Sequence, residues 1–246
     1  MAATQVVPGV YRISLGYVNA FLLVADDLTL IDTGFPGDGE TILEAVRSLG
    51  RRPEEIKRVL VTHCHSDHAG GLATIRRATG APAYMHPADA VIVKEGRPQR
   101  PLLPAPGLVT GVMFRLFIRA APPLEGTDVE GLVLDGEELP AAGGVRAIHV
   151  PGHCAGQLAF LWPPNGGVLF AADAASNVMG LGLSLGYEDL EEGRSSLAKL
   201  ASLQFEVACF GHGKPIGRGA SERFRRKWSP SAPLKEVGDR GELRAR

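Results

Sequence analysis

The chain has 246 residues, of which 45% are hydrophobic and 22% are charged, which is ordinary for a globular protein with a sizeable core. Its formal net charge of -1 gives no indication that a polyanion or an anionic membrane is the main partner. No apolar run approaches the roughly 20 residues that a membrane span needs. We therefore expect neither nucleic acid nor a membrane as a partner.

The cysteines and the N-terminus indicate a reducing compartment. Cys64, Cys154 and Cys209 cannot all pair with one another, and their spacing is not that of a disulfide framework. Residues 1–11 lack the charged segment and the apolar core of a signal peptide. These features predict a cytoplasmic protein.

Apolar periodicity predicts strands and helices along most of the chain. Because no internal repeat or sharp boundary is visible, we expect a single domain over residues 1–246, with a frayed tail at residues 229–246. Strands are expected at residues 10–15, 19–24, 28–32, 59–62, 83–86, 145–150, 158–162, 167–172 and 207–210, with further short strands within 129–139 around a turn at 135–136. Helices are expected at residues 40–49, 72–78, 88–94 and 190–203.

The most informative stretch is residues 59–71, Val-Leu-Val-Thr-His-Cys-His-Ser-Asp-His-Ala-Gly-Gly. Its short apolar strand is followed, within six positions, by His63, His65, Asp67 and His68. Residues two apart on an extended segment point the same way, so His63 and His65 can converge on one point. Asp67 and His68 follow where the chain turns and can face a second point close by. Imidazole and carboxylate ligands suit zinc, iron or manganese, so a metal is the simplest explanation of this cluster.

Three later strands also end in a residue that can bind a metal. His153 follows the strand at 145–150, Asp173 follows the strand at 167–172, and His212 follows the strand at 207–210. Each residue alone would be an ordinary loop residue. Loops at one edge of a rigid sheet are, however, where sites are usually built.

Residues 95–123 are the least regular part of the chain and are rich in proline. Two interpretations remain open for this excursion. It is either a surface segment that packs a little of itself on the core, or a loop or short helix that overhangs the active site. In the second case, Met113, Phe114 and Leu116 are candidates to line a substrate cleft.

Jointly, these motifs resemble the metallo-β-lactamase superfamily. Residues 63–71 fit its His-x-His-x-Asp-His motif, and Asp32-Thr-Gly, Pro151-Gly-His, Ala172-Asp and Gly211-His-Gly resemble its other motifs in the family's order. The resemblance covers nearly the whole chain from Val10 to His212. It implies an α/β fold, namely a four-layer αββα sandwich of two mixed β-sheets flanked by helices, with the metals at one edge.

The resemblance also implies a role for each candidate residue. The first metal would be held by His63, His65 and His153, and the second by Asp67, His68 and His212, with Asp173 bridging both. Asp32 would lie behind the ligands and hold them in place. The implied cofactors are two divalent metal ions per chain, with zinc preferred over iron or manganese. Asp67 would be the catalytic residue, because it would both ligate a metal and orient the attacking hydroxide.

The implied function is hydrolysis of a small ester-like molecule, a thioester or a lactone, by a metal-bridging hydroxide. The bridging position of Asp173 resembles the glyoxalase II, lactonase and phosphodiesterase branches more than the true β-lactamases. Lactonases typically place a Tyr shortly after this Asp, whereas here Ser176 and Asn177 follow and Tyr187 is more distant. Glyoxalase II enzymes add a helical C-terminal domain, for which the segment after His212 looks too short.

Two alternatives remain open on the same scaffold. One is a mononuclear iron oxidoreductase of the persulfide dioxygenase kind, and the other is a phosphodiesterase. The complete set of second-site ligands favours the dinuclear hydrolase. We interpret Cys64 and Cys154 as small packing residues and not as nucleophiles. The sequence leaves open whether Asn177 or Tyr187 contacts substrate, and whether the chain forms a dimer.

Overall fold

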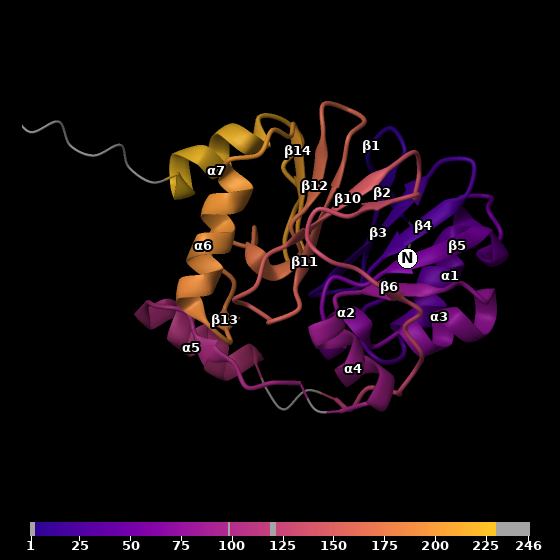
Figure 1. Ribbon diagram of the computed structural model, residues 1–246, viewed down its shortest axis with the longest axis horizontal. Coiled ribbons are helices and arrows are strands. Elements are labelled where there is room, and N and C mark those ends of the chain that lie inside the picture. The colour runs from indigo at the N-terminus through magenta and orange to yellow at the C-terminus, as the bar shows by residue number, and fades with distance from the viewer. Residues whose placement is uncertain (1–2, 98, 119–121, 230–246) are drawn as a thin grey trace, which may run out of the picture.

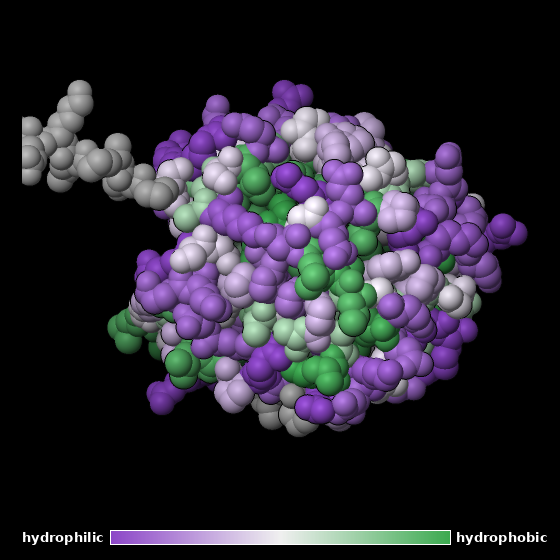
Figure 2. Space-filling model, viewed as in Figure 1, coloured by the Kyte–Doolittle hydropathy of each residue, from purple (hydrophilic) through white to green (hydrophobic). Residues whose placement is uncertain are grey.

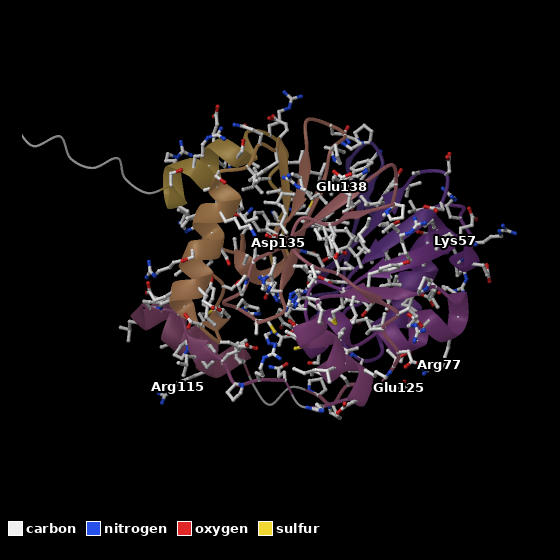
Figure 3. The ribbon with its side chains drawn as sticks, in the orientation of Figure 1. Lys57, Arg77, Arg115, Glu125, Asp135 and Glu138 are labelled. Carbon is white, nitrogen blue, oxygen red and sulfur yellow. The ribbon has the colours of Figure 1, made fainter. Side chains whose placement is uncertain are left out.

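Two β-sheets pack face to face, and helices cover the outer face of each sheet (Figure 1). The structure is a computed structural model, which describes residues 3–97, 99–118 and 122–229. Among these residues, no helix combines the length and the apolar character that a membrane crossing requires. Charged side chains such as Lys57, Arg77 and Arg115 project outward from the periphery (Figure 3).

The first sheet has the strand order β1-β2-β3-β4-β5-β6-β8. Neighbouring strands are antiparallel from β1 to β4 and parallel from β4 to β8, so the sheet is mixed. Its strands are β1 (Thr4–Val7), β2 (Val10–Ser14), β3 (Asn19–Val24), β4 (Leu28–Ile31), β5 (Ile56–Leu60), β6 (Ala83–Met85) and β8 (Gly131–Leu132).

The second sheet has the strand order β14-β12-β11-β10-β9, in which only β12 and β14 pair in parallel. Its strands are β9 (Glu138–Leu139), β10 (Val145–His149), β11 (Leu158–Trp162), β12 (Val168–Phe170) and β14 (Val207–Cys209). A separate pair joins β7 (Leu103–Pro104) to β13 (Gly186–Tyr187). The helices are α1 (Asp38–Ser48), α2 (Ser66–Ala69), α3 (Leu72–Thr79), α4 (Pro87–Glu95), α5 (Leu108–Phe117), α6 (Leu190–Ala201) and α7 (Ala220–Trp228).

Three apolar clusters lie between four layers. The first cluster joins the first sheet to α1, α3 and α4, the second lies between the two sheets, and the third joins the second sheet to α6 and α7. Phe21 and Phe170, for example, face each other across the middle cluster with ring centroids 5.4 Å apart. Burial of these faces from water is the main stabilisation of the fold. The predicted αββα sandwich of two mixed sheets is confirmed.

Several elements differ from the sequence-based expectation, among them β5, α7 and β1. Strand β5 ends at Leu60 and not at Thr62, because the Thr62 amide donates to Asp32 Oδ1 (2.8 Å) outside the strand ladder. Helix α7 lies in the basic tail, where no helix was expected, and its sparse apolar residues at i and i+4, Phe224 and Trp228, pack together. Edge strand β1 was also missed, because half of it is exposed and it shows no apolar run.

The proline-rich excursion contains β7 and α5, and its residues 98 and 119–121 lie outside the described part of the chain. The predicted frayed tail also lies outside it beyond Ser229. Phe114 packs beside Gly186, whereas Leu108 and Leu116 of α5 are exposed. Apolar surface is visible where α5 lies, at the lower left of Figure 2.

Candidate metal centre

The topology brings the predicted ligands to one edge of the sandwich. Strands β4 and β5 run parallel in the first sheet. In the second sheet β10 and β12 are both antiparallel to β11, and β12 is parallel to β14, so these three strands run the same way. The chain leaving β5 carries the His-x-His-x-Asp-His motif, and the loops after β10, β12 and β14 carry His153, Asp173 and His212. The carboxyl ends of these strands therefore meet.

Two kinds of backbone aim the motif residues. His65 is extended (φ -66°, ψ 147°) and occupies the N-cap position of α2, so that Asp67 and His68 lie on the following helical turn. This change from extended to helical backbone divides the motif into a first pair and a second pair, as the sequence predicted.

Asp32 and Ala172 adopt left-handed backbone (φ 60° and 47°), which is uncommon outside glycine and concentrates at functional sites.

The first cluster consists of three buried histidines, His63, His65 and His153. His65 Nδ1 lies 3.1 Å from His63 Nε2 and 3.0 Å from His153 Nε2. Three nitrogens bound to one zinc at about 2.0–2.1 Å would lie roughly 3.3 Å from one another. The spacing of these three nitrogens is therefore close to that of a shared ion.

The second cluster consists of Asp67, His68 and His212. Asp67 Oδ2 lies 3.3 Å from His212 Nε2 and 3.8 Å from His68 Nε2. These atoms are near enough to surround one cation, but only the His212 contact approaches hydrogen-bond length.

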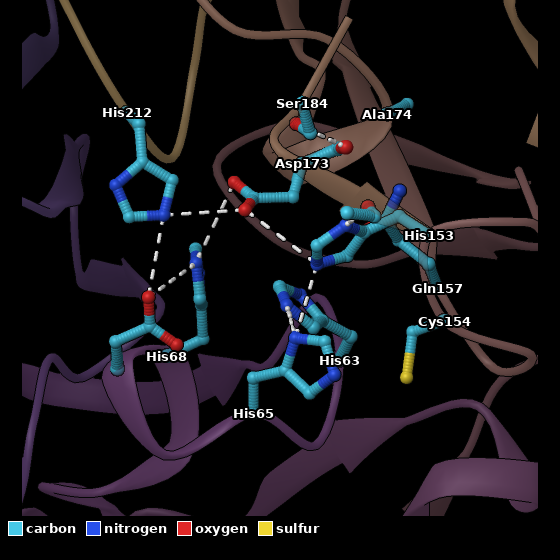
Figure 4. A network of polar contacts seen from close by, with 12 residues as sticks. His63, His65, His68, His153, Cys154, Gln157, Asp173, Ala174, Ser184 and His212 are labelled. Carbon is cyan, nitrogen blue, oxygen red and sulfur yellow. Dashed lines mark hydrogen bonds and ion pairs between the residues drawn. The ribbon is translucent and has the colours of Figure 1, made fainter. Parts of the chain in front are cut away.

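Asp173 lies between the two clusters (Figure 4). Its Oδ2 is 3.6 Å from His153 Nε2 in the first cluster and 3.2 Å from His212 Nε2 in the second. Its Oδ1 is 3.6 Å from His68 Nε2. One carboxylate thus faces both clusters, and all seven predicted ligands are brought together.

Outer partners fix the proton position on four of the five rings. These contacts are His63 Nδ1 to Thr62 Oγ1 (2.9 Å), His68 Nδ1 to Asp32 Oδ2 (2.8 Å), His153 Nδ1 to the Gly186 carbonyl (2.7 Å) and His212 Nδ1 to the Tyr17 carbonyl (2.7 Å). Carbonyl and carboxylate oxygens only accept, so Nδ1 is the donor in the last three contacts. The Thr62 hydroxyl donates to Asp32 Oδ2 (2.9 Å) and so accepts from His63. Each of these four rings therefore turns Nε2 inward.

The inward nitrogens of the first cluster lack protons to share, which tests whether the residues fit a metal. A neutral ring that donates through Nδ1 presents a lone pair at Nε2. His65 Nδ1 can donate to only one of His63 and His153, so at least one of its two close contacts joins lone pairs. His68 Nε2 and Asp173 Oδ1 are also buried and have no hydrogen-bond partner among the described residues. Buried polar atoms without partners are costly, and a cation relieves that cost. The residues fit metal ions.

The pKa values of the metal-free site point the same way. Burial and the neighbouring His153 lower the pKa of His65 to about 3. Burial also lowers the pKa of His68, but Asp67, Asp32 and Asp173 together raise it to about 9. Burial raises the pKa of Asp67, yet His68 and His212 hold it below its usual range. The negative charges of Asp67, Asp32 and Asp173 therefore favour a positive charge in the second cluster, which a cation would supply.

The glycine at 211 permits the ligands to approach the last strand. A Cβ atom there would lie 2.6 Å from His68 Cε1 and closer still to Asp173 Oδ1. Real Cβ contacts are not that short, so any larger residue would displace a ligand. Gly211 is therefore part of the site although it has no side chain.

The candidates for substrate contact are engaged within the protein. Tyr187 is buried, and its hydroxyl donates to the Ala174 carbonyl (3.2 Å) and accepts from the Ser184 amide (3.0 Å). Asn177 Nδ2 donates to the Lys214 carbonyl (2.6 Å). The sequence analysis missed the partners at Thr62, Tyr17 and Gly186. Two of these act through backbone carbonyls, which leave no signal in a sequence.

Comparison with known proteins shows the family. The sequence profile of the metallo-beta-lactamase superfamily matches residues 13–212. A hydroxyacylglutathione hydrolase from Cereibacter sphaeroides is 30% identical over 80% of this chain and 66% of its own length. The thioesterase pkgB from Emericella nidulans is 29% identical over 76% of this chain, which spans only 43% of that relative.

A solved structure shows the same fold. The metallo-beta-lactamase with a HARLDQ motif from Cronobacter sakazakii superimposes with a TM-score of 0.69, covering 87% of this chain and 78% of that protein at 22% identity. Together with the strand order and the ligand clusters, these matches confirm the resemblance seen in the sequence. The chain belongs to the metallo-β-lactamase superfamily and is a metal-dependent hydrolase.

Proposed function

We propose that the chain is a dinuclear hydrolase of small ester-like molecules, with a thioester as the first substrate class and a lactone as the second. The observation that carries the dinuclear assignment is the position of Asp173, whose single carboxylate lies 3.6 Å from His153 and 3.2 Å from His212. His63, His65 and His153 would hold one metal, and Asp67, His68 and His212 the other. We propose zinc for both positions, because imidazole and carboxylate ligands suit it.

Two divalent cations bound there would lower the pKa of a shared water toward neutrality and polarise the substrate carbonyl. Asp67 would orient that water, because its carboxylate is partly exposed and faces the second cluster. Its pKa is held low by His68 and His212 despite its partial burial, so it stays ionised and accepts hydrogen bonds at neutral pH. Asp32 and Thr62 would keep the rings of His68 and His63 in the orientation that the ions need.

The substrate class is supported by the relatives and not by a side chain of this site. Relatives named hydroxyacylglutathione hydrolase and thioesterase match most of the chain at 30% and 29% identity. No tyrosine follows Asp173 shortly in the sequence, and the hydroxyl of Tyr187 is already engaged by the Ala174 carbonyl and the Ser184 amide. The thioester is therefore placed before the lactone. We propose a cytoplasmic location on the sequence features alone.

The test begins with metal content. Protein purified without chelator should carry close to two zinc ions per chain by mass spectrometric elemental analysis, and chelation should abolish hydrolysis until zinc is restored. Thioester, lactone and phosphodiester substrates should then be compared at equal concentration. A single iron together with oxygen uptake on a persulfide would overturn the proposal in favour of the dioxygenase, and preferred cleavage of the phosphodiester would replace the substrate class.

A further inference from the structure

A buried carboxylate beside the metal centre belongs to neither cluster. Asp89 lies on α4 and is fully buried. Its Oδ2 accepts from the Cys64 amide (3.1 Å), and its Oδ1 accepts from the Gly156 amide (3.0 Å) and from the guanidinium of Arg100. The Cys154 thiol donates to Oδ2 as well, at 3.1 Å. A carboxylate so completely hydrogen-bonded is fixed in place.

A second carboxylate completes the arrangement. Glu188 follows β13, and its Oε2 accepts from the Ala155 amide (3.0 Å). Arg100 Nε donates to both oxygens of Glu188, at 2.8 Å and 2.9 Å. Arg100 thus joins Glu188 to Asp89 through its planar fork, a geometry that lysine cannot reproduce. Because Arg100 belongs to the proline-rich excursion, that segment contacts residues beside the candidate metal centre.

The backbone amides that donate to these carboxylates belong to residues close in sequence to the candidate metal ligands. Cys64 stands between His63 and His65, and Ala155 and Gly156 follow His153. Asp89 is therefore hydrogen-bonded to both of the loops whose rings must meet at 3.0–3.1 Å to form the first cluster. The two loops come from different sheets, after β5 and after β10, and they depend on such cross-links for their separation.

We propose that Asp89, Arg100 and Glu188 form a clamp that positions the loop of His63 and His65 against the loop of His153, and so sets the affinity of the first metal site. The clamp residues are positioning residues, because they act through the two loops. The inference rests on the proposed function, in which these three histidines hold a metal.

The close packing at Gly156 supports the clamp. A Cβ atom at this position would lie 2.5 Å from Asp89 Cγ, so only glycine lets the loop approach the carboxylate. The buried charge of Asp89 is compensated by the Arg100 guanidinium and by amide donors, as a retained buried charge must be. Cys64 Sγ, Asp89 and Cys154 Sγ also lie near enough to hold an ion. Their atoms already have hydrogen-bond partners, whereas His68 Nε2 and Asp173 Oδ1 of the two clusters have none among the described residues.

The experiment compares Asp89→Asn, Glu188→Gln and Arg100→Lys with the wild type. The matched control is Glu130→Gln, because Glu130 likewise pairs with an arginine, Arg76, and accepts from a backbone amide, that of Ala83 (3.0 Å), away from the ligand loops. The readouts are zinc affinity by chelator competition, metal ions per chain, and the melting temperature of the metal-free protein.

Each clamp variant should weaken zinc binding by about 10–100-fold, while Glu130→Gln stays at the wild-type affinity. Excess zinc should restore the turnover of the clamp variants, which a general loss of folding would not allow. If Asp89→Asn does not fold, Glu188→Gln and Arg100→Lys decide, since their side chains are partly exposed.

Wild-type zinc affinity in Glu188→Gln and Arg100→Lys would overturn the clamp and leave the proposed function standing. A third metal ion that is lost with Asp89→Asn would also overturn it, because the cluster would then bind an ion itself. Absence of bound metal from the wild type would overturn the proposed function first, and the clamp with it.

Discussion

The carboxylate of Asp32 accepts from His68 Nδ1 at 2.8 Å, and the same oxygen accepts from the Thr62 hydroxyl at 2.9 Å. Because Thr62 in turn accepts from His63 Nδ1 (2.9 Å), one carboxylate orients a ring in each ligand cluster. The backbone of Asp32 is left-handed (φ 60°), a conformation that costs energy for a residue with a side chain. That cost is offset because Asp32 fixes the orientation of two rings, that of His68 directly and that of His63 through Thr62.

Replacing Asp32 by Asn should weaken metal binding by about 10–100-fold, because the amide removes the negative charge behind His68 and presents a donor where an acceptor is needed. Zinc affinity by chelator competition measures the effect. Asp135→Asn is the control, since it removes a carboxylate of the same size from an exposed pair with Lys199. Equal affinities in the two variants would remove Asp32 from its orienting role.

His65→Ala should reduce both metal content and turnover by orders of magnitude. His65 Nδ1 is the atom that the other two nitrogens of the first cluster approach, so its loss leaves two ligands. Elemental analysis and a thioester assay give the two readouts. His86→Asn is the control, because it removes a histidine outside the clusters and keeps a good N-cap for α4. Turnover unchanged in His65→Ala would exclude this ring from the ligand set.

Asp173→Ala should lower the stoichiometry from two metals toward one. The carboxylate of Asp173 has polar contacts of 3.6 Å or less to histidines of both clusters, so without it the second ion loses a ligand and neighbouring charge. Titration with zinc, followed by calorimetry, would show one tight site and one weakened site. Two tightly bound ions in this variant would contradict a bridging role.

Gly211→Ala should impair metal binding while the fold is retained, because the added Cβ would press on His68 Cε1 and Asp173 Oδ1. Gly217→Ala is the matched control, since a Cβ there meets no atom within 4 Å and no left-handed backbone is required. Metal content and circular dichroism are compared for both variants. If both retain two metals, the close approach at Gly211 has no influence on the site.

Leu200→Ala should lower the free energy of unfolding by about 2–5 kcal/mol, because Leu200 of α6 is fully buried in the third apolar cluster and its truncation leaves a cavity. Leu108→Ala on α5 should change it by no more than about 0.5 kcal/mol, since that side chain is 87% exposed. Urea unfolding of the two variants measures the difference. A comparable loss in both would mean that the exposed face of α5 is covered in solution.

The sequence by itself predicted the fold class and the candidate ligands. Apolar runs such as residues 19–24 and 158–162 predicted their strands to the residue, because burial on both faces leaves an unmistakable pattern. The spacing of His63, His65, Asp67 and His68 predicted a divided cluster, because the backbone changes from extended to helical within it. Strand β1 and helix α7 were missed because they contain few buried apolar residues and so leave little pattern in the sequence.

Only the tertiary structure decided how far apart the ligands lie and what holds them. The rings of His65 and His153 belong to loops of different sheets, so their 3.0 Å contact depends on sheet packing and on the carboxylate of Asp89 between the loops. The carbonyls of Tyr17 and Gly186 orient two rings, yet any residue supplies a carbonyl. Sequence records which side chains are present; the distances between them arise from long-range packing, which local patterns do not encode.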